Sequence, residues 1–190
     1  MKVGVLALQG AAELHLAALR RIGAAAVPVR RPDELADVDR LILPGGESTT
    51  ISMMLDANGL TGPLAERLAG GMSTLGTCAG LLLLAAEVSD GRDDQHCFGA
   101  LDISARRNAY GSQTESFEAD LPIAALGPSP MTAVFIRSPI VERAGPGVEV
   151  LARLDGHPVL CREGRAWGCT FHPELSGDPR LHRLFCEEMA

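Results

Sequence analysis

A cysteine at the centre of a glycine-rich stretch is the first candidate for chemistry in this chain. Residues 76–80 read Gly-Thr-Cys-Ala-Gly, the spacing of a nucleophile elbow, in which a strand turns sharply into a helix and lifts the central side chain. Small residues flank it because the turn is too tight for larger ones. The positive end of the following helix would favour the thiolate form of Cys78. Taken alone, the stretch fits a buried structural cysteine equally well.

A cysteine nucleophile needs a base that takes the thiol proton and a group that orients this base. Among five histidines, only His172 ends a predicted strand, so it should emerge at a sheet edge as Cys78 does. Pro173 disfavours a helical conformation at His172, and Glu174 can fold back to hold the imidazole. By itself, a His-Pro-Glu motif more simply marks the end of a strand followed by a solvated glutamate. It indicates a catalytic pair here only in combination with the elbow. The other histidines fall on predicted helices, after an acidic loop or in a hairpin turn: His15, His182, His96 and His157.

A Pro-Gly-Gly loop after the predicted strand Arg40–Leu43 offers a third part of such a site. Acyl transfer develops an oxyanion, and donors already aimed at it are commonly worth ~10²–10³ in rate. The backbone amide of Ala79 would be one donor. That of Gly46 would be the second, because a glycine backbone can approach a ligand closely. A simple turn is the alternative, but both loops fall beyond the carboxyl ends of parallel strands, where ligands bind in such sheets.

The elements that position these residues alternate between strand and helix through the first half of the chain. Apolar periodicity and turn signals predict strands at 3–8, 25–29, 40–43 and 72–75, and helices at 11–22, 49–55, 61–69 and 79–87. Such alternation predicts an α/β fold with a parallel sheet that is covered by helices on both faces.

The second half changes to short strands separated by turns. We expect these strands to form antiparallel ribbons that lie beside the sheet or extend it. No linker interrupts the 190 residues, so residues 1–190 are expected to form a single domain. The predicted elements are strands at Leu101–Ala105, Glu115–Ala119, Thr132–Ile136, Val148–Leu154, Pro158–Arg162 and Ala166–Phe171, and a closing helix at Leu181–Met189.

Composition excludes several classes of function. The formal charge of −7 argues against nucleic acid as a partner, because phosphate binding needs a basic face. The apolar N-terminal run is broken by Gln9 and Glu13 before a signal-peptide core or membrane span is complete, so we expect a cytoplasmic protein without a membrane segment. The odd number of cysteines and the absence of a C-x-x-C pair indicate neither disulfides nor a zinc site. The cysteines other than Cys78 are expected to pack in the core: Cys97, Cys161, Cys169 and Cys186.

The order of the Pro-Gly-Gly-Glu-Ser-Thr-Thr loop, the elbow and His-Pro-Glu resembles class I glutamine amidotransferases. Further motifs resemble, more narrowly, the glutaminase subunits of bacterial pyridoxal 5'-phosphate synthases. The resemblance spans nearly the whole chain and implies their α/β architecture: a Rossmann-like (flavodoxin-like), mostly parallel sheet with flanking helices and added antiparallel ribbons. The narrower motifs are Leu8-Gln9-Gly10, residues 44–50, Arg107-Asn108, Glu115-Ser116-Phe117-Glu118 and Val134-Phe135-Ile136-Arg137.

This resemblance implies hydrolysis of L-glutamine to L-glutamate and ammonia without a cofactor or metal. The ammonia would pass to a separate pyridoxal 5'-phosphate synthase (lyase) subunit in a large hetero-oligomer that serves vitamin B6 biosynthesis. Carried onto matching positions, Cys78 is the nucleophile, and His172 and Glu174 complete its triad. An arginine suits the substrate carboxylate, and acidic or hydroxyl groups suit its ammonium and amide, although solvated surface arginines are the simpler alternative. The glutamine-binding positions would be Gly46, Glu47, Ser48, Arg107, Ile136 and Arg137.

Two other functions fit the same residues. One is another class I amidotransferase, or a γ-glutamyl or peptide hydrolase, on the same fold. The other is a noncatalytic regulatory component, against which the intact triad argues. Some positions depart from the family's usual pattern and concern partner docking more than catalysis: Leu14, Ser73, Thr74 and Arg106.

Overall fold

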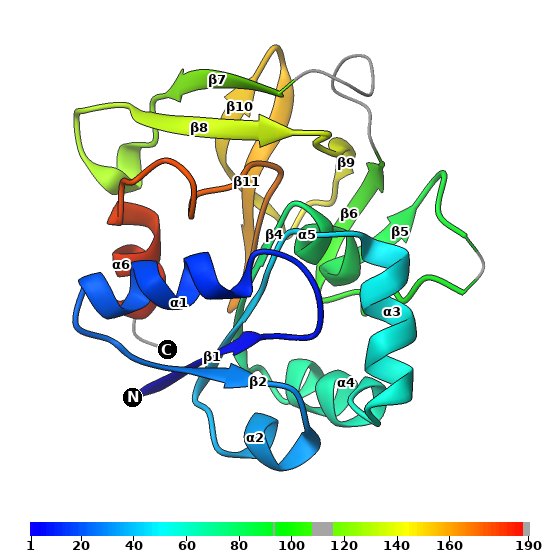
Figure 1. The fold of residues 1–190 in the computed structure, drawn as a ribbon. Coiled ribbons are helices and arrows are strands. Elements are labelled where there is room, and N and C mark those ends of the chain that lie inside the picture. The colour runs from blue at the N-terminus through cyan, green and yellow to red at the C-terminus, as the bar shows by residue number, and fades with distance from the viewer. Residues whose placement is uncertain (93, 108–115, 188–190) are drawn as a thin grey trace.

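The computed structural model describes residues 1–92, 94–107 and 116–187. At its centre is a seven-stranded sheet in the order β10-β11-β12-β4-β3-β1-β2 (Figure 1). Strands β1 to β4 and β12 run parallel, whereas β11 and β10 extend the sheet through antiparallel pairing. The predicted α/β class with a mostly parallel sheet is therefore confirmed. The strands are β1 (Lys2–Leu6), β2 (Ala25–Val29), β3 (Arg40–Leu43), β4 (Ser73–Thr77), β10 (Glu149–Leu154), β11 (His157–Glu163) and β12 (Ala166–Cys169).

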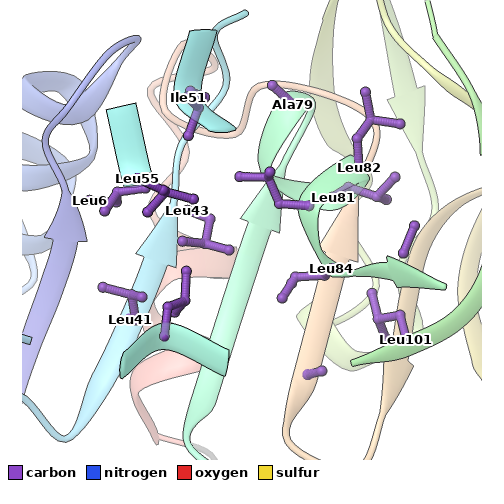
Figure 2. Close-up of a cluster of buried hydrophobic side chains, with 14 of the residues drawn as sticks. Leu6, Leu41, Leu43, Ile51, Leu55, Ala79, Leu81, Leu82, Leu84 and Leu101 are labelled. Carbon is purple, nitrogen blue, oxygen red and sulfur yellow. The ribbon is translucent and has the colours of Figure 1, made fainter. Parts of the chain in front are cut away.

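Helices cover both faces of this sheet. On one face, β1 and β3 send Val5 and Ile42 against α1 and α6, where Phe185 is fully buried. On the other face, Leu41 and Leu43 of β3 pack with α3, α4 and α5, and Figure 2 shows part of this cluster. Alternation of side chains along a strand explains why one strand supplies both cores. The helices are α1 (Ala12–Arg21), α2 (Pro32–Ala36), α3 (Ser48–Ala57), α4 (Thr61–Ala69), α5 (Ala79–Leu84) and α6 (Arg180–Glu187).

Two smaller sheets flank the central one. β5 (Ala85–Val88), β6 (Leu101–Arg106) and β9 (Ile140–Ala144) form a three-stranded sheet, and β7 (Ser116–Leu121) pairs with β8 (Met131–Ile136) as an antiparallel ribbon. A short 3-10 helix, Ala124–Leu126, connects β7 with β8. The ribbon covers an apolar cluster that includes the buried Phe135 and Phe171. The added antiparallel ribbons are therefore present.

Some predicted boundaries were wrong. The helix predicted over residues 79–87 ends at Leu84, and Ala85–Val88 is instead the strand β5. This segment pairs with β6, so a long-range partner overrides the local apolar pattern. The prediction missed α2 and β9, and it placed His157 in a turn although it begins β11. The expected core packing was confirmed for Cys161, Cys169 and Cys186 but was wrong for Cys97, which is exposed. The predicted termini at Glu115 and Met189, together with Asn108, lie outside the described residues.

Within the described residues, no helix combines the length and apolar character needed to cross a bilayer.

Candidate active site

Cys78 occupies a sharp turn between β4 and α5. Its backbone has φ 50° and ψ −105°, a positive-φ conformation that is unfavourable for a residue with a side chain. A Cβ atom on Gly76 would lie 2.4 Å from the carbonyl oxygen of Gly80, and one on Gly80 would lie 2.0 Å from that of Leu43. Both glycines are therefore required by close backbone contacts. This is the elbow geometry that the spacing of residues 76–80 predicts.

The loop after β12 brings His172 and Glu174 to the same edge of the sheet. The amide of Cys78 donates to the carbonyl of Cys169 at 2.8 Å, and the amide of His172 donates to that of Val134 at 2.8 Å. These bonds tie the elbow to β12 and the histidine loop to β8. The Nδ1 atom of His172 lies 2.8 Å from Oε1 of Glu174. His172 and Cys78 line the same cavity, and the interaction with Cys78 acts to raise the pKa of His172. The thiol, imidazole and carboxylate thus lie together at this edge.

Charge at this edge favours a protonated imidazole. Burial by itself lowers the pKa of His172, but the hydrogen bonds and negative charges of Cys78 and Glu174 raise it to about 10. Burial also acts to raise the pKa of Glu174, yet the hydrogen bond from His172 and the field of nearby histidines bring it below its ordinary value. The arrangement therefore stabilises an imidazolium between two acidic groups.

The Pro-Gly-Gly loop packs directly on this pair. A Cβ atom on Gly45 would lie 2.4 Å from Cε1 of His172 and 3.3 Å from Cβ of Cys78. A glycine is therefore needed at position 45 for the loop to approach the ring. Its neighbour Gly46 contacts Gln9 in the same way, since an added Cβ would lie 2.3 Å from Oε1 of Gln9.

A cavity of about 210 Å³ opens above the sulfur. This volume is below the ~300–1,000 Å³ typical of sites for drug-sized ligands, which suits a single small metabolite. Two lining residues, Leu82 and Pro139, were not predicted from the sequence. The remaining lining residues are the predicted positions Gly46, Glu47, Ser48, Cys78, Ala79, Arg107, Ile136, Arg137 and His172.

Glu47 and Arg107 form an ion pair at the cavity wall. Nη2 of Arg107 donates to Oε1 of Glu47 at 2.7 Å, and Nη1 donates to Oγ1 of Thr49 at 3.2 Å. Oε2 of Glu47 accepts from the amide of Thr50 at 2.8 Å and so caps α3. Burial acts to raise the pKa of Glu47, but the bonds from Thr50 and the charge of Arg107 lower it overall. The cavity therefore offers both signs of charge to a zwitterionic ligand.

β8 positions the far wall of the cavity. The carbonyl oxygen of Ile136 lies 4.0 Å from the sulfur of Cys78. The next residue, Arg137, has φ 44°, an uncommon conformation for a residue with a side chain. The structure thus brings Ile136 and Arg137 beside the catalytic candidates although they lie far from them in sequence.

A match to a protein-family model identifies the family of this chain. The model of the SNO glutamine amidotransferase family matches residues 5–190. The chain belongs to this family. Similar proteins carry the name pyridoxal 5'-phosphate synthase subunit PdxT. That of Acidothermus cellulolyticus is 53% identical over 194 residues, covering 100% of this chain and 94% of the relative, and that of Mycobacteroides abscessus is 53% identical, covering 97% and 95%.

Solved structures agree with the family. A crystal structure described as that of a glutamine amidotransferase superposes with a TM-score of 0.90 at 46% identity, covering 97% of each chain. The structure of PurLQS from Thermotoga maritima superposes with a TM-score of 0.66 at 16% identity, again covering 97% of each chain. The second likeness concerns the fold alone. This SNO-family chain is therefore a glutamine amidotransferase.

The sequence did not predict a supporting role for two residues at the site of this amidotransferase, Gln9 and Gln95. Oε1 of Gln9 accepts from the amide of Glu47 at 2.8 Å, and Oε1 of Gln95 accepts from the hydroxyl of Ser48 at 3.0 Å. The Leu8-Gln9-Gly10 motif contained Gln9, but it did not indicate what the side chain of Gln9 does. No signal marked Gln95, because its contact depends on how a long loop folds back over α3.

Proposed function

We propose that this chain hydrolyses L-glutamine to L-glutamate and ammonia and supplies the ammonia to the synthase component of a pyridoxal 5'-phosphate synthase. Cys78 is the nucleophile, His172 transfers protons, and Glu174 orients His172. The observation that supports this assignment most is the placement of Cys78 and His172 on one cavity with charged walls, with the His172 ring held 2.8 Å from the Glu174 carboxylate.

Substrate binding uses the two charges at the cavity wall. A zwitterionic amino acid can exchange its own charged groups with the pair of Arg107 and Glu47, because an arginine fork suits a carboxylate and a carboxylate suits an ammonium. The hydroxyl of Ser48, with Ile136 and Arg137 opposite, completes the contacts. The side-chain amide of glutamine would then lie toward Cys78.

The first half of the reaction releases ammonia. The Cys78 thiolate attacks the side-chain carbonyl carbon, and the carbonyl electron pair moves to oxygen, where the amides of Gly46 and Ala79 receive the developing charge. The His172 imidazolium gives its proton to the departing nitrogen as the C–N bond breaks. The product is ammonia, and a γ-glutamyl thioester remains on Cys78.

The second half regenerates the enzyme. Neutral His172 takes a proton from water as the water oxygen attacks the thioester carbon. The tetrahedral intermediate collapses, the C–S bond breaks, and the electron pair returns to sulfur. The new carboxyl group releases the second water proton to solvent, glutamate leaves, and the imidazolium and thiolate are restored. Glu174 remains ionised throughout, because its role is to hold the ring and stabilise its cation.

Delivery of ammonia calls for a partner. Ammonia is largely protonated near neutral pH and is then not a nucleophile, so direct transfer protects its reactivity. The relatives named PdxT are subunits of pyridoxal 5'-phosphate synthase, and we propose that this chain likewise docks on a synthase (lyase) subunit in a large hetero-oligomer. The single domain expected for residues 1–190 would form its glutaminase component.

The decisive experiment measures glutamate release by wild type and by Cys78→Ala, each with and without the synthase subunit from the same source. We expect wild type to hydrolyse glutamine, with stimulation by the synthase, and Cys78→Ala to lose at least about 10³-fold in kcat. Circular dichroism and thermal melting check that the variant folds. A Cys78→Ala protein with the parent rate would disprove the triad.

A substrate panel separates the remaining functions of this fold. Glutamine, a γ-glutamyl dipeptide and an unfolded protein substrate are offered to wild type under the same conditions. Turnover of glutamine alone supports the proposal, whereas faster turnover of the dipeptide would favour a γ-glutamyl hydrolase. Failure of Cys78 to react with a glutamine-like electrophile would favour a noncatalytic role.

A further inference from the structure

The carboxylate of Glu174 has a second, buried side that the proposed reaction does not use. Its side chain is fully inaccessible to solvent. Oε1 is bonded to His172, whereas Oε2 faces inward and makes no hydrogen bond of normal geometry to any described residue. Nε2 of His15 lies 3.3 Å from this inner oxygen. A buried carboxylate oxygen needs a nearby donor or a positive potential to stay ionised, and His15 is placed to supply it.

His15 belongs to a small network behind the triad. Its Nε2 atom lies 3.2 Å from the hydroxyl of Thr77, the residue before the nucleophile. Its Nδ1 atom lies 3.0 Å from Nε2 of His182, and the two imidazole rings are tilted at 53°. His15 and His182 are fully buried. The network therefore joins α1, α6, the end of β4 and the histidine loop (Figure 1).

Hydrogen bonding assigns the protons of the two rings. If His15 donated from Nδ1 to His182, the lone pair on its Nε2 would face the Glu174 carboxylate at 3.3 Å, which is repulsive. His182 would then also carry a buried Nδ1 proton, and that atom has no partner among the described residues. In the other arrangement, His182 donates from Nε2, and the Nε2 proton of His15 lies between Thr77 and Glu174. This second arrangement directs a donor, and not a lone pair, toward the carboxylate.

Both rings are neutral in this arrangement. Burial lowers the pKa of His15, and this effect exceeds the opposing attraction of Glu174, while His172 lowers it further. Burial and then His15 lower the pKa of His182 to about 3, with Arg21 of α1 acting in the same direction and Glu174 opposing. The thiol of Cys169 on β12 donates to the carbonyl oxygen of Phe171 at 3.4 Å, and burial and then the charge of Glu174 raise its pKa. A neutral donor stabilises the carboxylate without cancelling the charge that His172 requires.

We propose that His15, held in place by His182, is a positioning residue for glutamine hydrolysis, whose Nε2 proton keeps the Glu174 carboxylate ionised and directed at His172. This inference rests on the proposed triad. Thr77 shares the same proton, so His15 also fixes the strand end that carries the nucleophile. The side chain of His15 does not line the cavity, and it should therefore affect the chemical step more than substrate binding.

The test compares His15→Leu, which removes both nitrogens, with His15→Gln, whose amide can donate near the position of Nε2. Glutaminase activity is measured with the synthase subunit present, and alkylation of Cys78 by iodoacetamide is followed from about pH 5.5 to 9 by mass spectrometry of its peptide. For His15→Leu we expect kcat to fall about tenfold, the effect of one hydrogen bond to a charged group, with KM little changed. The acid limb of alkylation should move up by about one pH unit. His15→Gln should stay within about threefold of wild type.

Leu19→Ala provides the matched control. Leu19 is fully buried on the same helix but packs in the apolar cluster away from Glu174, so its truncation lowers stability without touching the network. We expect its alkylation profile to match wild type. A wild-type profile and kcat in His15→Leu, or an equal shift in Leu19→Ala, would overturn the inference. Cys78→Ala in the glutaminase assay tests the triad separately, because activity there would reject the triad whatever His15 does.

A spectroscopic measurement tests the assigned protons without any substitution. In wild type labelled with ¹⁵N-histidine, long-range ¹H–¹⁵N spectra at neutral pH should show His15 and His182 as neutral rings protonated on Nε2, and His172 as an imidazolium. A doubly protonated His15, or a proton on its Nδ1 atom, would contradict the proposal even if every His15 variant failed to fold.

Discussion

Glu174 separates two regions in which the same kind of side chain behaves in opposite ways. Toward the cavity, His172 lies between Glu174 and Cys78, and its pKa is raised to about 10. Toward the core, His15 lies 3.3 Å from the other oxygen of the same carboxylate, yet burial lowers its pKa. The difference teaches that proximity to a carboxylate does not by itself charge a histidine. A second acidic partner, present only at His172, offsets the cost of burying the cation.

Glu174→Gln should have the largest effect, because it changes the contacts of both His172 and His15. The site presents a donor on each side of the carboxylate, whereas an amide offers one acceptor oxygen and one donor nitrogen. Either His172 or His15 must then lose its contact, and the negative charge is gone from both. We expect kcat to fall roughly 10³-fold, as when the orienting carboxylate of a triad is neutralised.

Glu174→Asp is the control for this experiment because it keeps the charge with a shorter reach. It should recover part of the lost kcat, and the acid limb of Cys78 alkylation should lie nearer its wild-type position in Glu174→Asp than in Glu174→Gln, where it should move to higher pH. Equal losses in both variants would mean that shape, not charge, is what His172 requires.

The free energy of unfolding should depend on pH because His182 is neutral in the folded protein. His182 has a pKa of about 3 in the folded protein against an ordinary value of 6.5, so below pH 6.5 the unfolded state binds a proton that the folded state rejects. Stability attributable to this group is full above pH 6.5 and is lost as pH falls toward 3. By about pH 5 the free energy of unfolding should drop by about 2 kcal/mol from this residue. Urea titrations between neutral pH and about pH 5 measure it.

His182→Leu is the control for this measurement. The quantity compared is the change in the free energy of unfolding with pH, so a uniform loss of stability in the variant does not affect the result. The drop between about pH 6.5 and pH 5 should shrink by about 2 kcal/mol. His172 acts in the opposite pH window: its raised pKa contributes stability that is present below pH 6.5 and is lost as pH rises toward 10. An unchanged slope in the variant would show that His182 is protonated in the folded state.

The smallest predicted effect is on KM for glutamine and concerns two adjacent arginines. It tests the cavity wall and not the histidines behind Glu174. Arg107 lines the cavity and bonds to Glu47, whereas Arg106 forms an exposed ion pair with Glu142 at 2.9 Å. Arg107→Ala should raise KM for glutamine about tenfold with little change in kcat. Arg106→Ala should leave KM unchanged and alter stability by at most about 1 kcal/mol. Equal KM values for the two variants would remove Arg107 from the proposed substrate contacts.

Much of the fold could be predicted from the sequence because its signals are local. The strand preceding the elbow, the flanking helices and the glycine-rich turns follow from apolar periodicity and from residues that few conformations accept. Gly76 and Gly80 illustrate this, since each contacts a backbone carbonyl where no side chain fits. Strand β5 illustrates the limit, because its pairing with β6 decided its conformation against the local pattern.

The candidate site divides in the same way. Cys78, His172 and Glu174 could be proposed because each stands in a short motif whose geometry demands particular residue types. His15 and His182 could not, since nothing in the helices that carry them distinguishes a member of the network from a core histidine. Their meeting depends on α1 and α6 packing side by side on one face of the sheet.

The sequence by itself determined the candidate nucleophile, the tight turn that presents it and the alternation of strands and helices. These features depend only on residues within a few positions of one another. Only the tertiary structure decided how His15, His172 and His182 differ in pKa. Each pKa depends on burial and on partners brought from distant segments, with His15 and His182 separated by 167 positions in the sequence. Protonation is thus a property of the assembled core.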